Sequence, residues 1–131
     1  MVVTLTLALI SIVINTVGQA IIKHGVNRSS GIQLTLNEFI PSMKSALLDP
    51  IVGLGLFLIM LTIPSWVYVL SKLPLSVAAP MVSIGYVISI LIGYLVFKEA
   101  ITPFRIIGVV LIILGVIAIS STVNINPTIK H

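Results

Sequence analysis

The chain has 131 residues, of which 58% are hydrophobic and only 8% are charged, and its mean hydropathy is +1.27. It has too few polar side chains to cover a water-soluble globule, so the composition indicates an integral membrane protein. The net charge of +4 comes from seven Lys and Arg residues against three acids, which is too few basic residues for a nucleic-acid-binding surface.

The first apolar segment, from about Val2 to Ile22, is predicted to cross the membrane as a helix. A span needs about 20 helical residues, because the hydrocarbon core is about 30 Å thick and each residue adds about 1.5 Å. No basic residue precedes the segment and no small-residue cleavage site follows it. We therefore expect a retained span and not a signal peptide.

Polar side chains recur every four residues along this helix, at Ser11, Asn15, Gln19 and Lys23. This spacing places them in a slowly turning stripe on one face. Amides within a membrane usually face a bundle interior or a wet cavity, which predicts a substrate-binding face. The alternative is that Asn15 and Gln19 only hydrogen-bond a neighbouring helix, while Lys23 only anchors the helix end at the interface.

The stretch 23–49 is predicted to be a loop that holds a short interfacial helix. Residues 27–31 read NRSSG, which is typical of a loop. Apolar residues then recur at roughly helical spacing, at Phe39, Ile40, Met43 and Leu47.

Three further spans are predicted, at about 50–71, 74–97 and 102–122. Asp49 and Thr102 each precede a proline, which is typical of a helix start because the missing N–H of proline costs nothing in the first turn. The connections between these spans are so short that consecutive spans must be antiparallel neighbours. We therefore expect an all-α membrane protein in which residues 1–131 form a single bundle of four transmembrane helices.

Two of these spans contain an internal proline. Pro80 lies in the middle of the third span, with Ser83 and Tyr86 close to the same face. Because proline removes a backbone hydrogen bond, this pattern predicts a kink beside a substrate cavity, although proline is also tolerated for packing alone. Pro64 in the second span, with Trp66 nearby, has the same two interpretations.

Small residues form two further patterns. Gly85, Ser89 and Gly93 recur at four-residue spacing, which is typical of a helix-packing seam. Gly108 and Gly115 lie two turns apart on the last span, so they share a face that another helix could approach closely.

The acids and the missing residue types exclude several functions. Glu38, Asp49 and Glu99 all fall in loops or at span ends, which disfavours proton-coupled antiport through a buried acid. No nucleotide-binding loop and no nucleophile and base pair can be proposed, so we expect no enzyme activity. The chain has no Cys and only two His residues, so we expect neither a metal site nor a cofactor.

Basic residues are distributed unequally between the two ends of the predicted bundle. One end carries Lys23, Arg28, Lys44, Lys98 and Arg105, and the other carries Lys72 and Lys130. The positive-inside rule then predicts that both termini lie outside the cytoplasm.

Three segments resemble the small multidrug resistance group of the drug/metabolite transporter (EamA-like) superfamily. They are GQAIIK at 18–23, LPLSVAAPMVSIGY at 73–86 and KEAITPFRIIGVVLIILGV at 98–116. Members of this group are four-helix proteins that work as pairs. The resemblance therefore implies a homodimer or a heterodimer with a similar subunit, with Gly108 and Gly115 at the dimer interface.

The chain departs from the drug-exporting members at the positions that bind their cargo. Asn15 stands where those members carry an essential Glu, and Ala79 and Val82 stand where they carry aromatic residues. The first segment and the PMVS sequence at 80–83 are instead similar to the branch of aminoarabinose-phosphoundecaprenol flippase subunits. That similarity implies a polyprenyl-phosphate-linked sugar, or a similar anionic lipid, as the cargo.

Our leading hypothesis is therefore a subunit of a bacterial inner-membrane transporter that flips such a lipid between leaflets. Asn15, Gln19 and Ser83 would solvate the headgroup, and Lys23 would attract the phosphate. The other residues expected at the substrate site are Ser11, Trp66, Pro80 and Tyr86. Two alternatives stay open: an exporter of polar metabolites or organic cations, and an accessory subunit that does not itself transport.

Overall fold

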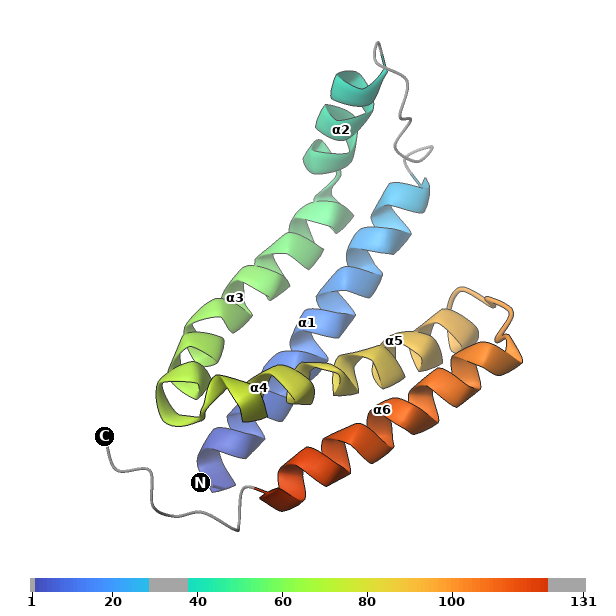
Figure 1. Cartoon of the computed structure of the whole chain (residues 1–131). Helices are drawn as coiled ribbons and strands as arrows, with labels where there is room; N and C mark the ends of the chain where they lie inside the picture. The colour runs from blue at the N-terminus through green and yellow to red at the C-terminus, as the bar shows by residue number, and fades with distance from the viewer. Residues whose placement is uncertain (1, 29–37, 123–131) are drawn as a thin grey trace.

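The computed structural model describes residues 2–28 and 38–122, and all regular structure within these ranges is helical (Figure 1). The helices are α1 (Val2–Arg28), α2 (Phe39–Leu48), α3 (Pro50–Lys72), α4 (Leu75–Val82), α5 (Ile84–Leu95) and α6 (Pro103–Thr122). Three stretches are long and apolar enough to cross a membrane, namely α1, α3 and the pair α4–α5. With α6 as a shorter apolar helix, the predicted all-α membrane bundle is confirmed.

The first helix is longer than predicted, because α1 continues through Lys23 and ends at Arg28. Packing explains the extension. Gly25 is buried against α3, where an added Cβ would lie 2.7 Å from Cγ2 of Val52, so the two helices stay in close contact beyond the apolar segment. Residues 27 and 28 of the predicted loop are therefore helical, while residues 29–31 lie outside the described residues. The short helix predicted within 23–49 is present as α2.

The second and fourth predicted spans begin where the proline pattern indicated. Pro50 is the first residue of α3, and the side chain of Asp49 accepts a hydrogen bond from the backbone N–H of Ile51 at 2.7 Å. This bond satisfies one of the N–H groups that a helix start leaves without an intrahelical partner. Likewise α6 begins at Pro103.

The third predicted span is not one continuous helix, since a turn at Ser83 separates α4 from α5. The backbone N–H of Ser83 donates to the carbonyl of Pro80 at 3.0 Å, and the Ser83 hydroxyl donates to the same carbonyl. The N–H of Tyr86 donates in turn to the carbonyl of Ser83 at 3.0 Å. These bonds join residues three apart, so they tighten the turn and bend the span shortly after its proline. The prediction of a kink here is confirmed.

The closest helix crossing in the described structure lies between α1 and α3, which run side by side in opposite directions (Figure 1). Gly18 and Gly55 face each other at this crossing. A Cβ at Gly55 would lie 2.7 Å from the carbonyl oxygen of Gly18, and a Cβ at Gly18 would lie 3.0 Å from that of Gly55. Only glycine at both positions lets the two backbones approach so closely.

A second close contact joins α5 to α1. A Cβ at Gly85 would lie 3.1 Å from Oγ1 of Thr16 and 3.3 Å from Cγ2 of Ile12. The packing role predicted for Gly85 is therefore confirmed.

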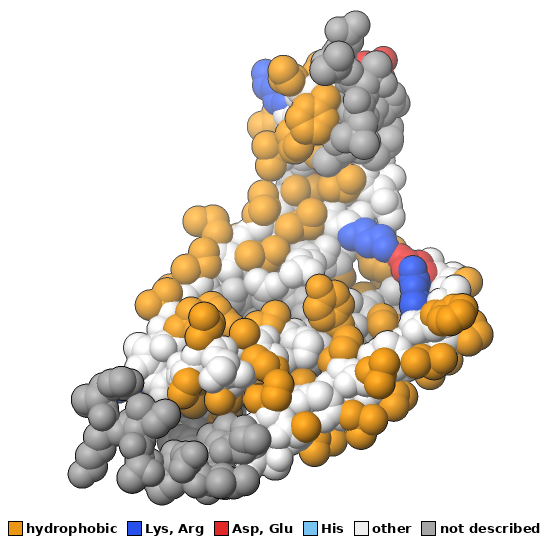
Figure 2. All heavy atoms as spheres, in the orientation of Figure 1, with side chains coloured by type: hydrophobic (Ala, Val, Ile, Leu, Met, Phe, Trp, Pro, Cys, Tyr) orange, Lys and Arg blue, Asp and Glu red, His pale blue; other side chains and the backbone are white. Residues whose placement is uncertain are grey.

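The outer side of α6 carries exposed hydrophobic side chains (Figure 2). Phe104 is 85% exposed, Leu111 63% and Leu114 57%. A Cβ at Gly108 or at Gly115 would meet nothing within 4 Å. Within the described residues nothing covers this side of α6, which is therefore available to lipid or to another subunit.

Candidate functional site

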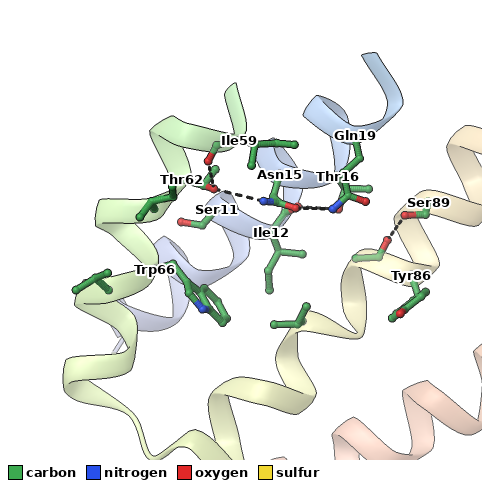
Figure 3. Close-up of a pocket in the computed structure, with 14 residues that line it drawn as sticks. Ser11, Ile12, Asn15, Thr16, Gln19, Ile59, Thr62, Trp66, Tyr86 and Ser89 are labelled. Carbon is green, nitrogen blue, oxygen red and sulfur yellow. Dashed lines mark hydrogen bonds between the residues drawn. The ribbon is translucent and has the colours of Figure 1, made fainter. Parts of the chain in front are cut away.

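The polar stripe of α1 faces a cavity of about 410 Å³ between α1, α3 and the α4–α5 junction (Figure 3). Ligand pockets in proteins commonly have volumes of roughly 300–1,000 Å³. The polar and aromatic side chains of its lining are Ser11, Asn15, Thr16, Gln19, Thr62, Trp66, Tyr86 and Ser89. We call this space the polar cavity.

A chain of hydrogen bonds fixes the two amides of the stripe. Nε2 of Gln19 donates to Oδ1 of Asn15 at 2.7 Å, and Nδ2 of Asn15 donates to Oγ1 of Thr62 at 3.5 Å. The Thr62 hydroxyl donates in turn to the carbonyl of Ile59 at 2.7 Å. Asn15 therefore bonds a neighbouring helix and lines the cavity at the same time, and its role in substrate binding stays a prediction.

The polar cavity is neutral, because none of its lining residues carries a charge. Amide and hydroxyl groups act as donors and as acceptors, and the rings of Trp66 and Tyr86 offer flat apolar surface. This combination suits an uncharged molecule with several hydroxyl groups. Part of the lining is exposed, with Ile63 56%, Val67 60% and Tyr86 64% exposed, so the cavity opens outward through an apolar rim.

A second cavity of about 330 Å³ adjoins the first and shares Thr16, Gln19 and Ser89 with it. Its lining also includes Lys23, Glu99 and Arg105, so its character is charged. We call it the charged cavity. The two cavities together follow the polar stripe of α1 from Ser11 to Lys23.

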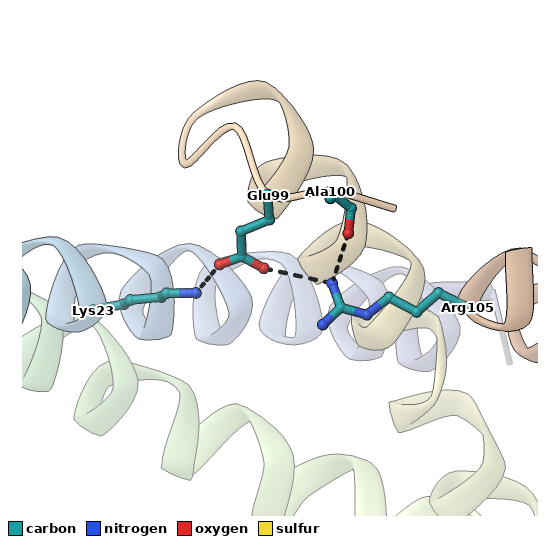
Figure 4. Close-up of polar contacts among 4 residues, drawn as sticks. All are labelled: Lys23, Glu99, Ala100 and Arg105. Atoms are coloured by element: carbon teal, nitrogen blue, oxygen red, sulfur yellow. Dashed lines mark hydrogen bonds and ion pairs between the residues drawn. The ribbon is translucent and has the colours of Figure 1, made fainter. Parts of the chain in front are cut away.

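The charged side chains of this second cavity contact one another (Figure 4). The ammonium of Lys23 donates to Oε1 of Glu99, and Nη1 of Arg105 lies 3.7 Å from Oε2 of the same carboxylate. The hydrogen bond from Lys23, reinforced by the positive charges of Lys23 and Arg105, lowers the pKa of Glu99. Glu99 is thus ionised at neutral pH, and this Lys23–Glu99–Arg105 cluster of two cations and one carboxylate carries one net positive charge.

The connection between α5 and α6 turns Glu99 back towards α1. Lys98 has a φ of 52°, in the left-handed region that residues other than glycine rarely adopt. The N–H of Glu99 donates to the carbonyl of Gly93 at 3.0 Å. A Cβ at Gly93 would lie 3.2 Å from Oε2 of Glu99, so this glycine makes room for the carboxylate and does not pack against another helix there.

The structure brings most of the predicted substrate residues together. The polar cavity contains Ser11, Asn15, Gln19, Trp66 and Tyr86, and the charged cavity contains Lys23. Pro80 and Ser83 line neither of these cavities and instead form the bend between α4 and α5.

Sequence reasoning missed six polar lining residues: Thr16, Thr62, Ser89, Tyr94, Glu99 and Arg105. Thr62 lies one helical turn before Trp66, so the shared face was a usable signal. For Glu99 the signal was its charge at a helix connection, but its partner on α1 is 76 residues away. Among the described residues, no three His, Asp or Glu side chains are grouped as a metal site.

Comparison with known proteins identifies relatives of this chain. Residues 2–121 match the EamA-like transporter family. A protein of Photorhabdus laumondii subsp. laumondii named probable 4-amino-4-deoxy-L-arabinose-phosphoundecaprenol flippase subunit ArnF is 34% identical over 118 residues, covering 86% of this chain and 92% of the relative. The ArnF protein of Shewanella sediminis is 36% identical over 122 residues, covering 86% and 84%.

A relative of the other subunit type matches equally well. The protein of Pseudomonas fluorescens named probable 4-amino-4-deoxy-L-arabinose-phosphoundecaprenol flippase subunit ArnE is 34% identical over 113 residues, covering 86% of this chain and 93% of the relative. No solved structure gives a significant match. The family match spans nearly the whole chain. The apolar helices of the chain make it a multi-pass membrane protein. The chain therefore belongs to the EamA-like transporter family.

Proposed function

We propose that this protein is a subunit of a flippase that moves a polyprenyl-phosphate-linked sugar, or a similar anionic lipid, between the leaflets of a bacterial inner membrane. One observation carries the proposal: a neutral polar cavity continues, through shared residues, into a cavity that holds two cations. A lipid-linked sugar has the same sequence of chemical groups, namely hydroxyl groups followed by a phosphate. The names of the relatives, which are flippase subunits for such a lipid, support the same cargo.

Each part of the cargo has a place in this arrangement. Asn15 and Gln19 hydrogen-bond the sugar hydroxyl groups in the polar cavity, and Trp66 and Tyr86 pack against the ring. Lys23 attracts the phosphate at the other end of the stripe. The hydrocarbon tail leaves through the apolar rim and stays in the bilayer, so that only the headgroup enters the protein.

The remaining predicted residues give the polar cavity its shape. Pro80 and Ser83 set the bend after which Tyr86 reaches the rim of the polar cavity. Ser11, 4% exposed, closes the end of the cavity opposite Lys23. The contact of both Lys23 and Arg105 with Glu99 places these two basic residues at one end of the bundle. We assign this end to the cytoplasm and both termini to the opposite side.

The cargo assignment can be tested in proteoliposomes that contain the purified protein and a polyprenyl-phosphate-linked sugar. A membrane-impermeant reagent that modifies the sugar measures how fast headgroups reach the outer leaflet. We expect Gln19→Ala to slow this rate about tenfold, because the loss of one hydrogen bond to the headgroup costs roughly 1.4 kcal/mol. Wild-type protein that does not move the lipid would overturn the proposed function.

Asn27→Ala is the matched control for Gln19→Ala. It removes an amide from the same helix, but Asn27 is exposed near the end of α1 and lines neither cavity. Transport by this control should equal that of wild type. If both variants transport equally well, the polar stripe does not bind the headgroup.

The polar cavity on its own supports a second candidate function, export of a small polar molecule. Its volume of about 410 Å³ suits a small ligand, and its lining carries no charge. Proteoliposomes that contain no polyprenyl lipid would then move the small polar molecule across the membrane. If the purified subunit binds neither lipid nor solute and appears only with a partner protein, an accessory role replaces both candidates.

We further propose that a second four-helix subunit, identical or similar, packs on α6 at Gly108 and Gly115. Because a Cβ at either glycine meets nothing within 4 Å among the described residues, Gly108→Leu and Gly115→Leu should leave the folded subunit intact. Native mass spectrometry should show that both variants lose the dimer. Gly53→Leu, at an equally open position on α3, should retain it, and equal dimer content in all three variants would place the interface elsewhere.

A further inference from the structure

Two cations from distant parts of the chain converge on a single carboxylate in the charged cavity. Lys23 comes from the last turns of α1, Arg105 from the first turn of α6, and Glu99 from the connection between α5 and α6. The exposed fractions of the three side chains are 48%, 51% and 34%. The cluster is therefore accessible to a ligand that enters this cavity.

The cluster has an unused capacity to bind an anion. Its two positive charges face one negative charge. The 3.7 Å between Nη1 of Arg105 and Oε2 of Glu99 is longer than a hydrogen bond, so the guanidinium is not tightly engaged by this carboxylate. Arg105 also contacts the carbonyl of Ala100 at 3.5 Å, which is a weak bond as well. A guanidinium has five N–H donors in a fork that matches phosphate and carboxylate alike.

The surroundings of Lys23 hold its ammonium in place beside the polar cavity. The ammonium of Lys23 lies 4.8 Å from the centre of the Phe97 ring, a favourable cation–π distance. Gln19, which lines both cavities, lies one helical turn before Lys23 on the same face of α1. A phosphate at this cluster would thus adjoin a headgroup in the polar cavity.

We infer that Lys23 and Arg105 together form the binding site for the cargo's phosphate group, and that Glu99 occupies this site as an internal carboxylate until the phosphate displaces it. The inference rests on the proposed function and names the residues that bind the phosphate group of the cargo. Because Glu99 connects the α5–α6 end to α1, its displacement also releases this connection when cargo binds.

The test measures binding of undecaprenyl phosphate to the detergent-purified full-length protein by native mass spectrometry titration. Glu99→Gln removes the competing charge with little change in shape. It is expected to bind undecaprenyl phosphate about tenfold more tightly than wild type, since a charge-assisted hydrogen bond contributes enough for such a change. Glu38→Gln, at an exposed position before α2 that lines neither cavity, should bind as wild type does.

Arg105→Gln gives an independent test, because it keeps the Lys23–Glu99 pair. It is expected to weaken binding of undecaprenyl phosphate about tenfold. The matched control is Arg28→Gln, which removes an exposed cation at the end of α1 that lines neither cavity. Undecaprenol, which lacks the phosphate, should bind wild type and Glu99→Gln equally.

A competition experiment with inorganic phosphate distinguishes a lipid phosphate from free phosphate as the natural ligand. We expect a large excess of inorganic phosphate to leave the bound lipid in place, and displacement by stoichiometric amounts would overturn the lipid assignment. Unchanged lipid affinity in both Glu99→Gln and Arg105→Gln would overturn the inference while the proposed function stands. The proposed function itself fails if the wild-type protein binds no undecaprenyl phosphate.

Discussion

Replacement of Lys23 by alanine is expected to slow transport of the lipid-linked sugar at least about tenfold, while the folded subunit remains in the membrane. Lys23 holds the carboxylate of Glu99 and lines the charged cavity, so it is the first cation that a phosphate leaving the polar cavity would meet. A hydrogen bond to a charged group commonly contributes about 1.5–3 kcal/mol, and every 1.4 kcal/mol is tenfold. We therefore expect a rate lower by a factor of about ten or more.

The fold should tolerate this change. The Lys23 side chain is 48% exposed, and Glu99 retains Arg105 as a neighbouring cation after the substitution. No charge is therefore left buried without compensation. The amount of protein in the membrane, measured by immunoblotting, should match that of wild type.

Lys44→Ala is the matched control for Lys23→Ala. Lys44 lies exposed on α2 and lines neither cavity, so its loss changes the net charge equally without touching the site. Headgroup exposure in proteoliposomes should be normal for Lys44→Ala. Transport at the wild-type rate by Lys23→Ala would show that Lys23 serves only to anchor the helix end.

The largest effect on stability is expected for Gly55→Ala. The new Cβ would lie 2.7 Å from the carbonyl oxygen of Gly18 and 3.0 Å from the backbone nitrogen of Ile22. Backbone atoms cannot rotate away as a flexible side chain can, so α1 and α3 would have to separate. Overpacking of this kind typically costs about 1–3 kcal/mol.

Gly53→Ala is the control, because it adds the same methyl group two residues away on α3, where a Cβ meets nothing within 4 Å. This variant should be as stable as wild type or slightly more stable, since alanine favours a helix over glycine by about 1 kcal/mol. Unfolding in mixed detergent micelles, followed by circular dichroism, compares the two variants. Equal midpoints would mean that α1 and α3 do not cross at Gly55.

The same crossing also sets the geometry of the polar cavity. Asn15 lies one helical turn before Gly18 on α1, and it reaches Thr62 on α3 at 3.5 Å. A wider crossing would break this bond and move the stripe away from α3. If the Gly55→Ala variant retains its fold, it should therefore also lose transport. The Gly53→Ala variant should keep it.

The sequence by itself determined that the protein lies in a membrane, where most of its helices begin, and which stripe of α1 faces the candidate site. Long apolar segments require a bilayer and a helical backbone. The residues before Pro50 and Pro103 marked two helix starts, and Pro80 marked the bend in the third span. The stripe from Ser11 to Lys23 follows from helical periodicity alone, so four of the residues that α1 contributes could be predicted, whereas Thr16 was missed.

Only the tertiary structure decided what stands opposite that stripe. The bend at Ser83 turns Gly85, Tyr86 and Ser89 of α5 towards the polar cavity, whereas Pro80 and Ser83 line neither cavity. The end of α1 at Arg28 depends on the contact of Gly25 with α3, and the pairing of Lys23 with Glu99 spans 76 residues. Local patterns report interactions within a few residues of one another. Contacts between distant segments depend on how the helices cross, which the close approach of Gly18 and Gly55 fixes only in the folded bundle.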